Sequence, residues 1–348
     1  MMAGVPTKSN MFMNAKDIRI VFMGTPEFAV PSLKALVEGG YNVVGVVTMP
    51  DKPAGRGMKL QESDVKRAAK ELGISTILQP EKLRDEEFLK ALRALQPDLG
   101  IVIAFRMLPE VVWAMPRFGT FNLHASLRPE YRGAAPINWA IINGDKESGN
   151  TTFLLNHEID KGAIIGQQRT PIGNEECVGE LYDRLMTMGA ELVVESVEKI
   201  ASGNIEPIEQ PQEDTNLRPA PKIFKDMCEV DWSKNGTQIV NFVRGLSPYP
   251  AAWSILQRGE EKLSVKIFKV HFEEMAHSAE VGTIFTDNKT YIKVACADGV
   301  VTIEELQVAG KKRMAVRDLL LGYQMQNAKF RIQNAKCKMQ NSECKIEN

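Results

Sequence analysis

The sequence of 348 residues predicts a doubly wound α/β domain with a mostly parallel sheet, followed by a small β-barrel. Up to Gly203, short apolar runs alternate with amphipathic helical stretches, which is the pattern of parallel strands joined by crossover helices. After a stretch rich in Pro and Glu, short strand-like runs are separated by turn residues, as in a small barrel. The hydrophobic content of 44% is enough to fill the cores of two domains.

The first domain is expected to contain short strands that end at turn residues, with helices between them. Strands are expected over residues 18–23, 41–48, 74–78 and 99–104, and helices over 31–37, 64–72 and 85–95. This alternation predicts a Rossmann-like sheet. It does not predict a dinucleotide site, because Gly24 stands alone after the first strand and a pyrophosphate requires the pattern G-x-G-x-x-G.

A polar pair falls at the end of the next expected strand, which reads FGTFNLH. Because side chains alternate along a strand, Phe121 and Leu123 share one face, and Asn122 and His124 share the other. Pro129 cannot continue the strand, so the pair is expected at its carboxyl end. Ligands bind at that end in open α/β sheets, and an amide donor beside an imidazole suits acyl transfer.

A third candidate in the same region is Asp160. A helix is expected over 134–142, with Pro136 in its first turn, and extended structure resumes at Thr151. Asp160 is then followed by Lys-Gly, a loop signature that can return a carboxylate to the side of His124. The sequence therefore predicts one site that contains Asn, His and Asp.

The motifs around these residues resemble those of the methionyl-tRNA formyltransferases, a family of folate-dependent formyltransferases. The resemblance covers Ile18 to Tyr323 and rests on Asn-x-His, the Ser-Leu turn with its Pro, RGAAPI, Asp-x-Gly, GTPEFAV and PDKPAGRG. Three positions depart from the family pattern. Arg128 replaces the second Leu of the turn, Phe105-Arg106 stands where Tyr-Gly is expected, and the residues before Asp160 are more polar than usual.

The resemblance implies transfer of a formyl group from 10-formyltetrahydrofolate, a co-substrate, to the amino group of initiator methionyl-tRNA, with no metal. It also implies roles: Asn122 donates its amide to the oxyanion, His124 handles the proton, and Asp160 orients His124. His157 lies near Asp160, but the pattern does not require it. The residues implied to line the folate pocket are Phe105, Arg106, Met107, Leu108, Ser126, Leu127, Arg128 and Pro129.

The segment 51–70 is locally basic, and its first part contains a proline and two glycines, which predict an irregular, mobile loop. Composition alone favours a solvated surface loop, whereas the resemblance implies that Lys52, Arg56 and Lys59 contact the acceptor arm of tRNA. Lys311, Lys312 and Arg313 are expected to form a second tRNA contact. They follow the barrel strands, and the resemblance implies that this barrel is an OB-like domain.

The expected organisation has five parts. These are a flexible N-terminal extension (1–16), the catalytic domain (17–203), a linker (204–225), the OB-like tRNA-contacting domain (226–323) and a repetitive tail (324–348). A long helix over 177–200 closes the catalytic domain. A helix over 237–244 precedes barrel strands at 252–256, 263–270, 282–285, 291–295 and 300–306. The tail repeats three polar units of seven residues and is expected to be disordered or frayed.

Composition excludes several other classes of protein. A net charge of −1 excludes a globally basic nucleic-acid binder, and the scattered five cysteines indicate neither a disulfide framework nor a zinc site. No run is long enough to span a membrane and no signal peptide is evident, so we expect a cytoplasmic protein. No obligate protein partner is indicated. The alternatives are a formyltransferase acting on a small amine and a non-catalytic RNA-binding protein.

Overall fold

The computed structural model describes residues 13–54, 59–158, 161–211, 216–325 and 327–331. The chain divides into two compact units. The first comprises Met1–Ile137, Lys146–Ile172 and Glu180–Pro221, and the second comprises Asn138–Asp145, Gly173–Gly179 and Lys222–Asn348. Two short segments that lie within the sequence of the first unit therefore pack with the second.

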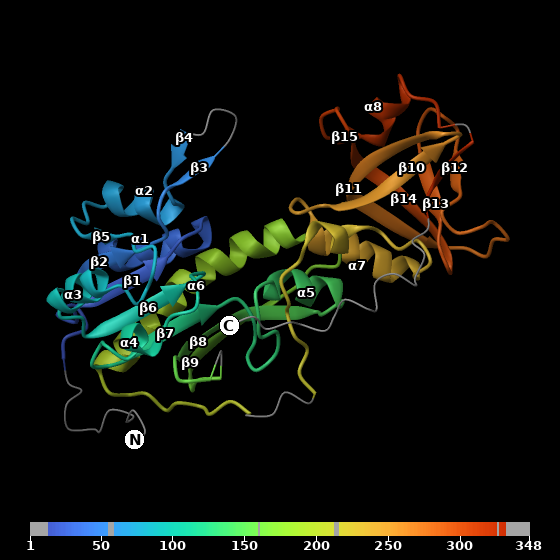
Figure 1. The fold of residues 1–348 in the computed structure, drawn as a ribbon. Helices are drawn as coiled ribbons and strands as arrows, with labels where there is room; N and C mark the ends of the chain where they lie inside the picture. The colour runs from blue at the N-terminus through green and yellow to red at the C-terminus, as the bar shows by residue number, and fades with distance from the viewer. Residues whose placement is uncertain (1–12, 55–58, 159–160, 212–215, 326, 332–348) are drawn as a thin grey trace. The chain divides into compact units, whose positions relative to one another are not determined.

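The first unit is built on a mostly parallel sheet (Figure 1). Its strands are β1 (Ile20–Gly24), β2 (Val43–Val47), β5 (Ile77–Leu78), β6 (Leu99–Ile103), β7 (Thr120–His124), β8 (Glu147–Leu154) and β9 (Ile164–Pro171). The helices in this part of the chain are η2 (Glu27–Ala29), α1 (Val30–Glu38), α2 (Asp64–Glu71), α3 (Glu86–Ala94), α4 (Glu110–Trp113), α5 (Pro136–Ile142) and α6 (Val178–Ala201).

The strand order of this sheet is β5-β2-β1-β6-β7-β8-β9. The pairs from β5 to β7 are parallel, whereas β8 and β9 pair antiparallel. The chain moves outward from β1 through β2 to β5, then returns to the other side of β1 with β6 and β7. The point between β1 and β6 is thus a topological switch point, and the expected doubly wound fold is confirmed.

Both faces of the sheet are covered, because its central strands are apolar on both sides. On one face, α3 and α4 pack against Val21, Met23 and Val102. On the other, α6 lies so close to β7 that a Cβ added at Gly189 would stand 2.7 Å from Cδ2 of Leu123. The side chains of Asn122 and His124 therefore face the α3 and α4 side, since Leu123 faces α6.

The basic segment after β2 differs from the expected irregular loop. Its ends form a hairpin of β3 (Lys52–Ala54) and β4 (Lys59–Gln61), in which Lys52 pairs with Gln61. The base of the hairpin is anchored by Asp51, which accepts hydrogen bonds from Lys66 Nζ at 2.6 Å and Gln79 Nε2 at 2.8 Å. These bonds hold the pKa of Asp51 below its ordinary value. Pro53 is paired with Leu60, so the proline does not prevent strand pairing here. Gly55 and Gly57 lie outside the described residues.

The second unit is an antiparallel barrel with a helix packed on it. Its elements are η3 (Lys225–Cys228), α7 (Gly236–Leu246), β10 (Ala252–Arg258), β11 (Glu261–Glu274), β12 (Ile284–Thr286), β13 (Ile292–Ala295), β14 (Gly299–Val308), β15 (Met314–Ala315), α8 (Val316–Leu320) and β16 (Ala328–Phe330). The strand order is β12-β13-β14-β11-β10-β16, with β15 on β14. A bridge between Thr283 and Lys329 joins the two ends of the sheet, so the expected small barrel is confirmed.

Within the first repeat of the tail, strand β16 is part of this barrel, contrary to the expectation of disorder. Strand β16 pairs with β10, and Phe330 is 1% exposed. Its ring stacks on that of the fully buried Trp232, with ring centroids 5.2 Å apart. The side chain of Phe330 therefore anchors β16 to the barrel, although most other residues of the repeat are polar. The composition of the repeat did not reveal this packing. The later repeats lie outside the described residues.

We expect Phe330→Ala to destabilise the second unit by about 3–5 kcal/mol, because it removes a buried ring and leaves a cavity beside Trp232. The measurement is urea unfolding followed by tryptophan fluorescence. Leu321→Ala is the matched control, since Leu321 is 87% exposed in the same unit and its loss should change the unfolding free energy little. Equal effects of the two substitutions would contradict the docking of β16.

Candidate active site

Three loops meet at one edge of the first sheet. Strands β1, β6 and β7 are adjacent and parallel, with Gly24 beside Ile103 and Ile103 beside Leu123. Their carboxyl ends therefore lie together, and the chain that follows each strand leaves from the same edge. This edge lies at the switch point of the sheet, where an open α/β fold forms its ligand site.

Strand β7 places Asn122 and His124 on one face, as the sequence predicts. Phe121 and Leu123 are buried on one face, whereas Asn122 is half-buried and His124 is 9% exposed on the other. The cross-strand neighbours of Asn122 are Val102 on β6 and Phe153 on β8. The amide and the imidazole are two residues apart on one face, at the carboxyl end of β7.

The imidazole of His124 has partners for both of its ring nitrogens. Nε2 is 3.2 Å from the carbonyl oxygen of Gly133, which can only accept, so this nitrogen carries the proton in that hydrogen bond. Nδ1 is 3.1 Å from Oγ of Ser126, and that hydroxyl is also 3.0 Å from the carbonyl oxygen of Glu130. The Ser126 hydroxyl can donate to a neutral imidazole, or accept from a protonated one and donate to Glu130. His124 therefore keeps this hydrogen bond in either protonation state.

The turn after β7 is held by strands β8 and β9. The Oγ1 atom of the fully buried Thr151 donates to the carbonyl oxygen of Ser126 at 2.7 Å and accepts from the backbone N–H of Arg128 at 3.1 Å. Gln167 Nε2 donates to Thr151 Oγ1 at 3.0 Å and to the Arg128 carbonyl oxygen at 2.9 Å. Sequence reasoning missed Thr151 and Gln167, because neither belongs to a motif. Thr151 is one of several polar residues in the buried part of β8, and Gln167 is half-buried in β9.

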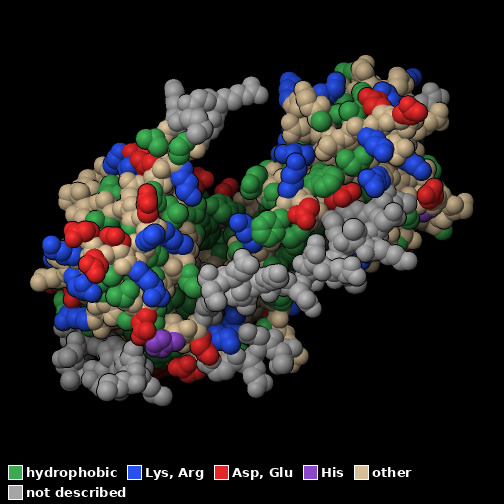
Figure 2. All heavy atoms as spheres, viewed as in Figure 1, with side chains coloured by type: hydrophobic (Ala, Val, Ile, Leu, Met, Phe, Trp, Pro, Cys, Tyr) green, Lys and Arg blue, Asp and Glu red, His purple; other side chains and the backbone are tan. Residues whose placement is uncertain are grey.

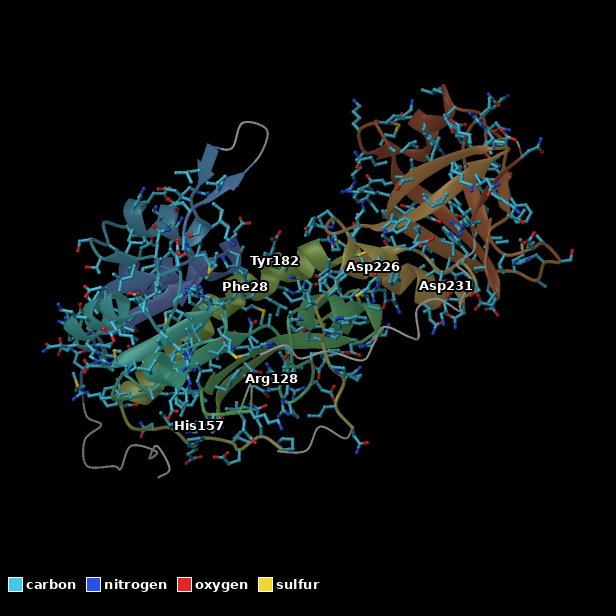
Figure 3. The ribbon with its side chains drawn as sticks, in the orientation of Figure 1. Phe28, Arg128, His157, Tyr182, Asp226 and Asp231 are labelled. Atoms are coloured by element: carbon cyan, nitrogen blue, oxygen red, sulfur yellow. The ribbon has the colours of Figure 1, made fainter. Side chains whose placement is uncertain are left out.

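Arg128, which departs from the family pattern, is buried at 4% exposure. Its guanidinium lies over the ring of Phe153, 5.2 Å from the ring centroid. Arg128 is labelled in Figure 3. Phe153 is the cross-strand neighbour of Asn122, and directly opposed residues project to the same side of a sheet. A buried cation thus stands on the side of the sheet that carries the Asn-His pair. An aliphatic side chain at this position would supply no charge.

Residues 105–108, which were predicted to line the folate pocket, lie in different environments. Leu108 is buried in the apolar cluster beneath α4, and Phe105 packs against that cluster, whereas Met107 is 70% exposed. Arg106 donates from Nη1 to the carbonyl oxygen of Glu81 at 2.7 Å and from Nη2 to that of Pro80. Burial lowers the pKa of Arg106. Its guanidinium therefore joins the loop after β6 to the chain that follows β5.

The predicted third residue, Asp160, lies outside the described residues. The neighbouring Gly162 is placed, and its backbone runs directly against β8: an added Cβ would stand 1.5 Å from the carbonyl oxygen of Leu154. Only glycine fits such an approach. His157 lies at an exposed turn, 3.5 Å from Glu110 and edge-on to Trp113 at 5.3 Å between centroids. Its side chain is 65% exposed, unlike that of His124.

The segment predicted as a linker contacts the site. The buried Gln210 donates to the carbonyl oxygen of Gly162 at 2.7 Å, and its Oε1 is 3.4 Å from Nη2 of Arg132. Ala220 donates its N–H to the Arg132 carbonyl oxygen at 2.8 Å and forms a bridge with Gly133. The segment therefore supports both the Asp160 loop and the carbonyl that contacts His124. Its Pro-rich composition gave no signal of this.

The residues predicted to bind tRNA fall in both units. Lys52 is exposed on the β3-β4 hairpin, Lys59 belongs to β4, and Arg56 lies outside the described residues. Lys311 and Lys312 are exposed after β14, whereas Arg313 donates from Nε to Glu305 at 3.0 Å and stacks on the ring of Phe268. Arg313 is thus engaged by an acid within its own unit.

The class of protein follows from comparison of this chain with known families. Residues 18–197 match the formyl transferase family, and residues 222–324 match the formyl transferase C-terminal domain. The chain therefore belongs to the formyl transferase family.

Relatives of similar length narrow this class. The chain is 57% identical to the methionyl-tRNA formyltransferase of Parabacteroides distasonis over 90% of this chain and 98% of that protein. It is 58% identical to that of Phocaeicola vulgatus, again over 90% and 98% of the two chains. The resemblance indicated by the sequence motifs is thereby confirmed. Among solved structures, the sugar 3N-formyl transferase WlaRD matches the fold with a TM-score of 0.59 and 19% identity, over 85% of this chain and 99% of that one.

Within the described part of the chain, no helix combines the length and the apolar character that a membrane crossing requires.

Proposed function

We propose that this protein transfers the formyl group of 10-formyltetrahydrofolate to the amino group of initiator methionyl-tRNA. The observation that carries the proposal is the Asn122-His124 pair at the carboxyl end of β7, in a chain that matches methionyl-tRNA formyltransferases over nearly their whole length. The basic hairpin and the barrel support a macromolecular acceptor, because a small amine would require neither. In this proposal Lys52, Arg56, Lys59, Lys311 and Lys312 contact tRNA.

The reaction exchanges one carbon–nitrogen bond for another. The amino nitrogen of the methionyl group attacks the formyl carbon, which forms a tetrahedral intermediate with negative charge on the formyl oxygen. Asn122 donates its amide to that oxygen, where the charge develops. The bond from carbon to the folate nitrogen then breaks, and a proton passes from the amine to that nitrogen. The products are formylmethionyl-tRNA and tetrahydrofolate.

His124 is the proposed proton carrier, and Asp160 is the proposed residue that orients it. The Ser126 hydroxyl supports this role, because it can exchange donor and acceptor positions as the imidazole gains and loses a proton. The folate pocket is proposed to lie between the loop after β6 and the turn after β7. Exposed Met107 and the backbone of residues 126–129 are its proposed contacts, while Arg106 and Leu108 support the loop from behind.

We expect formyl transfer to methionyl-tRNA and little transfer to a small amine. The measurement is the formation of formylmethionyl-tRNA from radiolabelled 10-formyltetrahydrofolate. Parallel reactions contain initiator methionyl-tRNA, elongator methionyl-tRNA or a nucleotide-linked amino sugar. Initiator methionyl-tRNA should be the preferred acceptor. Preferred formylation of the amino sugar would contradict the tRNA proposal, and failure of all three acceptors would contradict formyl transfer itself.

A further inference from the structure

One short segment of the first unit, residues 79–81 directly after β5, contacts the chain that follows two other strands. We call it the bridging segment. Its hydrogen bonds reach Met49 and Asp51 after β2 on one side, and Arg106 after β6 on the other. In the strand order, β2 and β1 lie between β5 and β6, so the bridging segment joins loops from separate strands along the carboxyl edge of the sheet. This is the edge that carries the candidate active site.

On the side of β2, the contacts come from the amide of Gln79. Its Nε2 atom donates to the carbonyl oxygen of Met49 at 2.9 Å and to the carboxylate of Asp51 at 2.8 Å. Asp51 also accepts from Nζ of Lys66 on α2 at 2.6 Å, and it directly precedes β3. The bridging segment therefore holds the base of the β3-β4 hairpin, which carries lysines proposed to contact tRNA.

On the side of β6, the contacts come from the guanidinium of Arg106. Nη1 donates to the carbonyl oxygen of Glu81 at 2.7 Å, and Nη2 donates to that of Pro80. Hydrogen bonds from a charged donor are about twice as strong as those between neutral groups. The glycine that the family pattern has at this position could supply neither bond. The side chain of Arg106 therefore fixes the loop that presents Met107, a proposed folate contact, to the bridging segment.

The bridging segment and the loop after β6 also rest on one apolar cluster. Leu83, which lies two residues beyond the segment, and Leu108 are both buried in this cluster. Leu78, which directly precedes the segment, and Phe105 pack against the same cluster. Close-packed side chains transmit a displacement, because the core has little free volume to absorb it. A movement of the loop after β6 is therefore passed to the bridging segment.

We propose that Arg106 and Gln79 are positioning residues that couple the loop after β6 to the β3-β4 hairpin, so that each substrate favours binding of the other. This inference rests on the proposed function, which places folate at that loop and tRNA at the hairpin. A substrate that orders one loop also orders the bridging segment, and the second substrate then has less chain to order.

Charge alone would act in the opposite direction, because folate and tRNA are both anions and repel each other. Figure 2 shows Lys and Arg side chains mixed with Asp and Glu over the visible face of the first unit. Binding of one anion beside such a mixed surface gives the second anion no electrostatic advantage. Positive coupling between the two substrates would therefore report on the contacts of Arg106 and Gln79.

The test is a binding cycle with tetrahydrofolate and initiator methionyl-tRNA, which do not react because tetrahydrofolate carries no formyl group. The affinity for tetrahydrofolate is measured with and without saturating tRNA. In the parent, tRNA should tighten this binding by about tenfold, a value typical of coupled sites. R106M and Q79M keep an unbranched side chain and remove the donors, so each should reduce the effect below about twofold. R106M/Q79M should resemble either single variant, because each breaks the same connection.

The matched control is R84M, since Arg84 is exposed close to the bridging segment but outside it. It should keep the tenfold effect of the parent. Hydrogen exchange supplies a readout that needs no tRNA: tetrahydrofolate should slow amide exchange in β4 of the parent and of R84M, but not of R106M or Q79M. Circular dichroism shows that each variant is folded, and Q79M decides the question if R106M does not fold.

Three results would overturn the coupling while leaving the proposed function intact. They are a tetrahydrofolate affinity that tRNA does not change in the parent, an undiminished effect in folded R106M and Q79M, and an equal loss in R84M. Formylation of methionyl-tRNA by the parent is measured in parallel. Its failure would instead overturn the proposed function.

Discussion

His124→Ala should reduce turnover by about 10²–10⁴-fold, because it removes the group proposed to move the proton from the amine to the folate nitrogen. Folate affinity should change little, since the Ser126 turn remains held by Thr151 and Gln167. The measurement is kcat for formylation of methionyl-tRNA, together with folate binding by fluorescence.

The matched control is His157→Ala. His157 is exposed and contacts Glu110 and Trp113, so its loss should leave turnover close to that of the parent. A His157→Ala variant as impaired as His124→Ala would mean that the proton carrier was assigned to the wrong histidine. Near-normal turnover of a folded His124→Ala variant would contradict the proposed role of His124 as the proton carrier.

Gly162→Ala should lower kcat by about 10²-fold although it adds only a methyl group. The added Cβ would stand 1.5 Å from the Leu154 carbonyl oxygen, so the backbone at 162 must move away from β8. Asp160 is two residues away, and a displacement of about 1 Å at a catalytic group is enough for a loss of this size. The measurement is kcat and KM for both substrates.

Gly322→Ala is the control, because a Cβ added there meets nothing within 4 Å. It should match the parent in turnover and in thermal stability. Circular dichroism separates a displaced loop from an unfolded protein: we expect Gly162→Ala to retain its fold and to lose kcat. Wild-type turnover for a folded Gly162→Ala variant would show that the loop carrying Asp160 does not contribute to catalysis.

The parts of the fold that local patterns determine were predictable from the sequence. Alternation along β7 assigned Asn122 and His124 to one face, and the apolar runs before turn residues located the strands of the parallel sheet. Both signals arise within a few residues of chain, so one sequence is enough to read them. The family motifs then supplied chemical roles that the spacing alone left open.

The parts that distant segments determine were not predictable. Thr151 supports the turn at 126–129 through contacts 23 and 25 residues away in sequence, and Gln210 reaches Gly162 across 48 residues. At the base of the β3-β4 hairpin, Asp51 bonds to Lys66 and Gln79, which lie 15 and 28 residues away in sequence, and a local composition typical of irregular loops does not reveal these contacts. Phe330 shows the same limit, since its docking depends on the distant Trp232, which the sequence of the repeat does not indicate.

The contacts of the segment before Pro221 also constrain the order in which the protein can mature during synthesis. Chains emerge from the ribosome amino end first, and domains fold as their residues become available. Gln210 and Ala220 support the site through their contacts with Gly162 and Arg132. The site of the first unit therefore forms only after residue 220 has left the exit tunnel, which is later than the emergence of α6. We therefore expect nascent chains that stop between α6 and Pro221 to hold a formed sheet and an incomplete site.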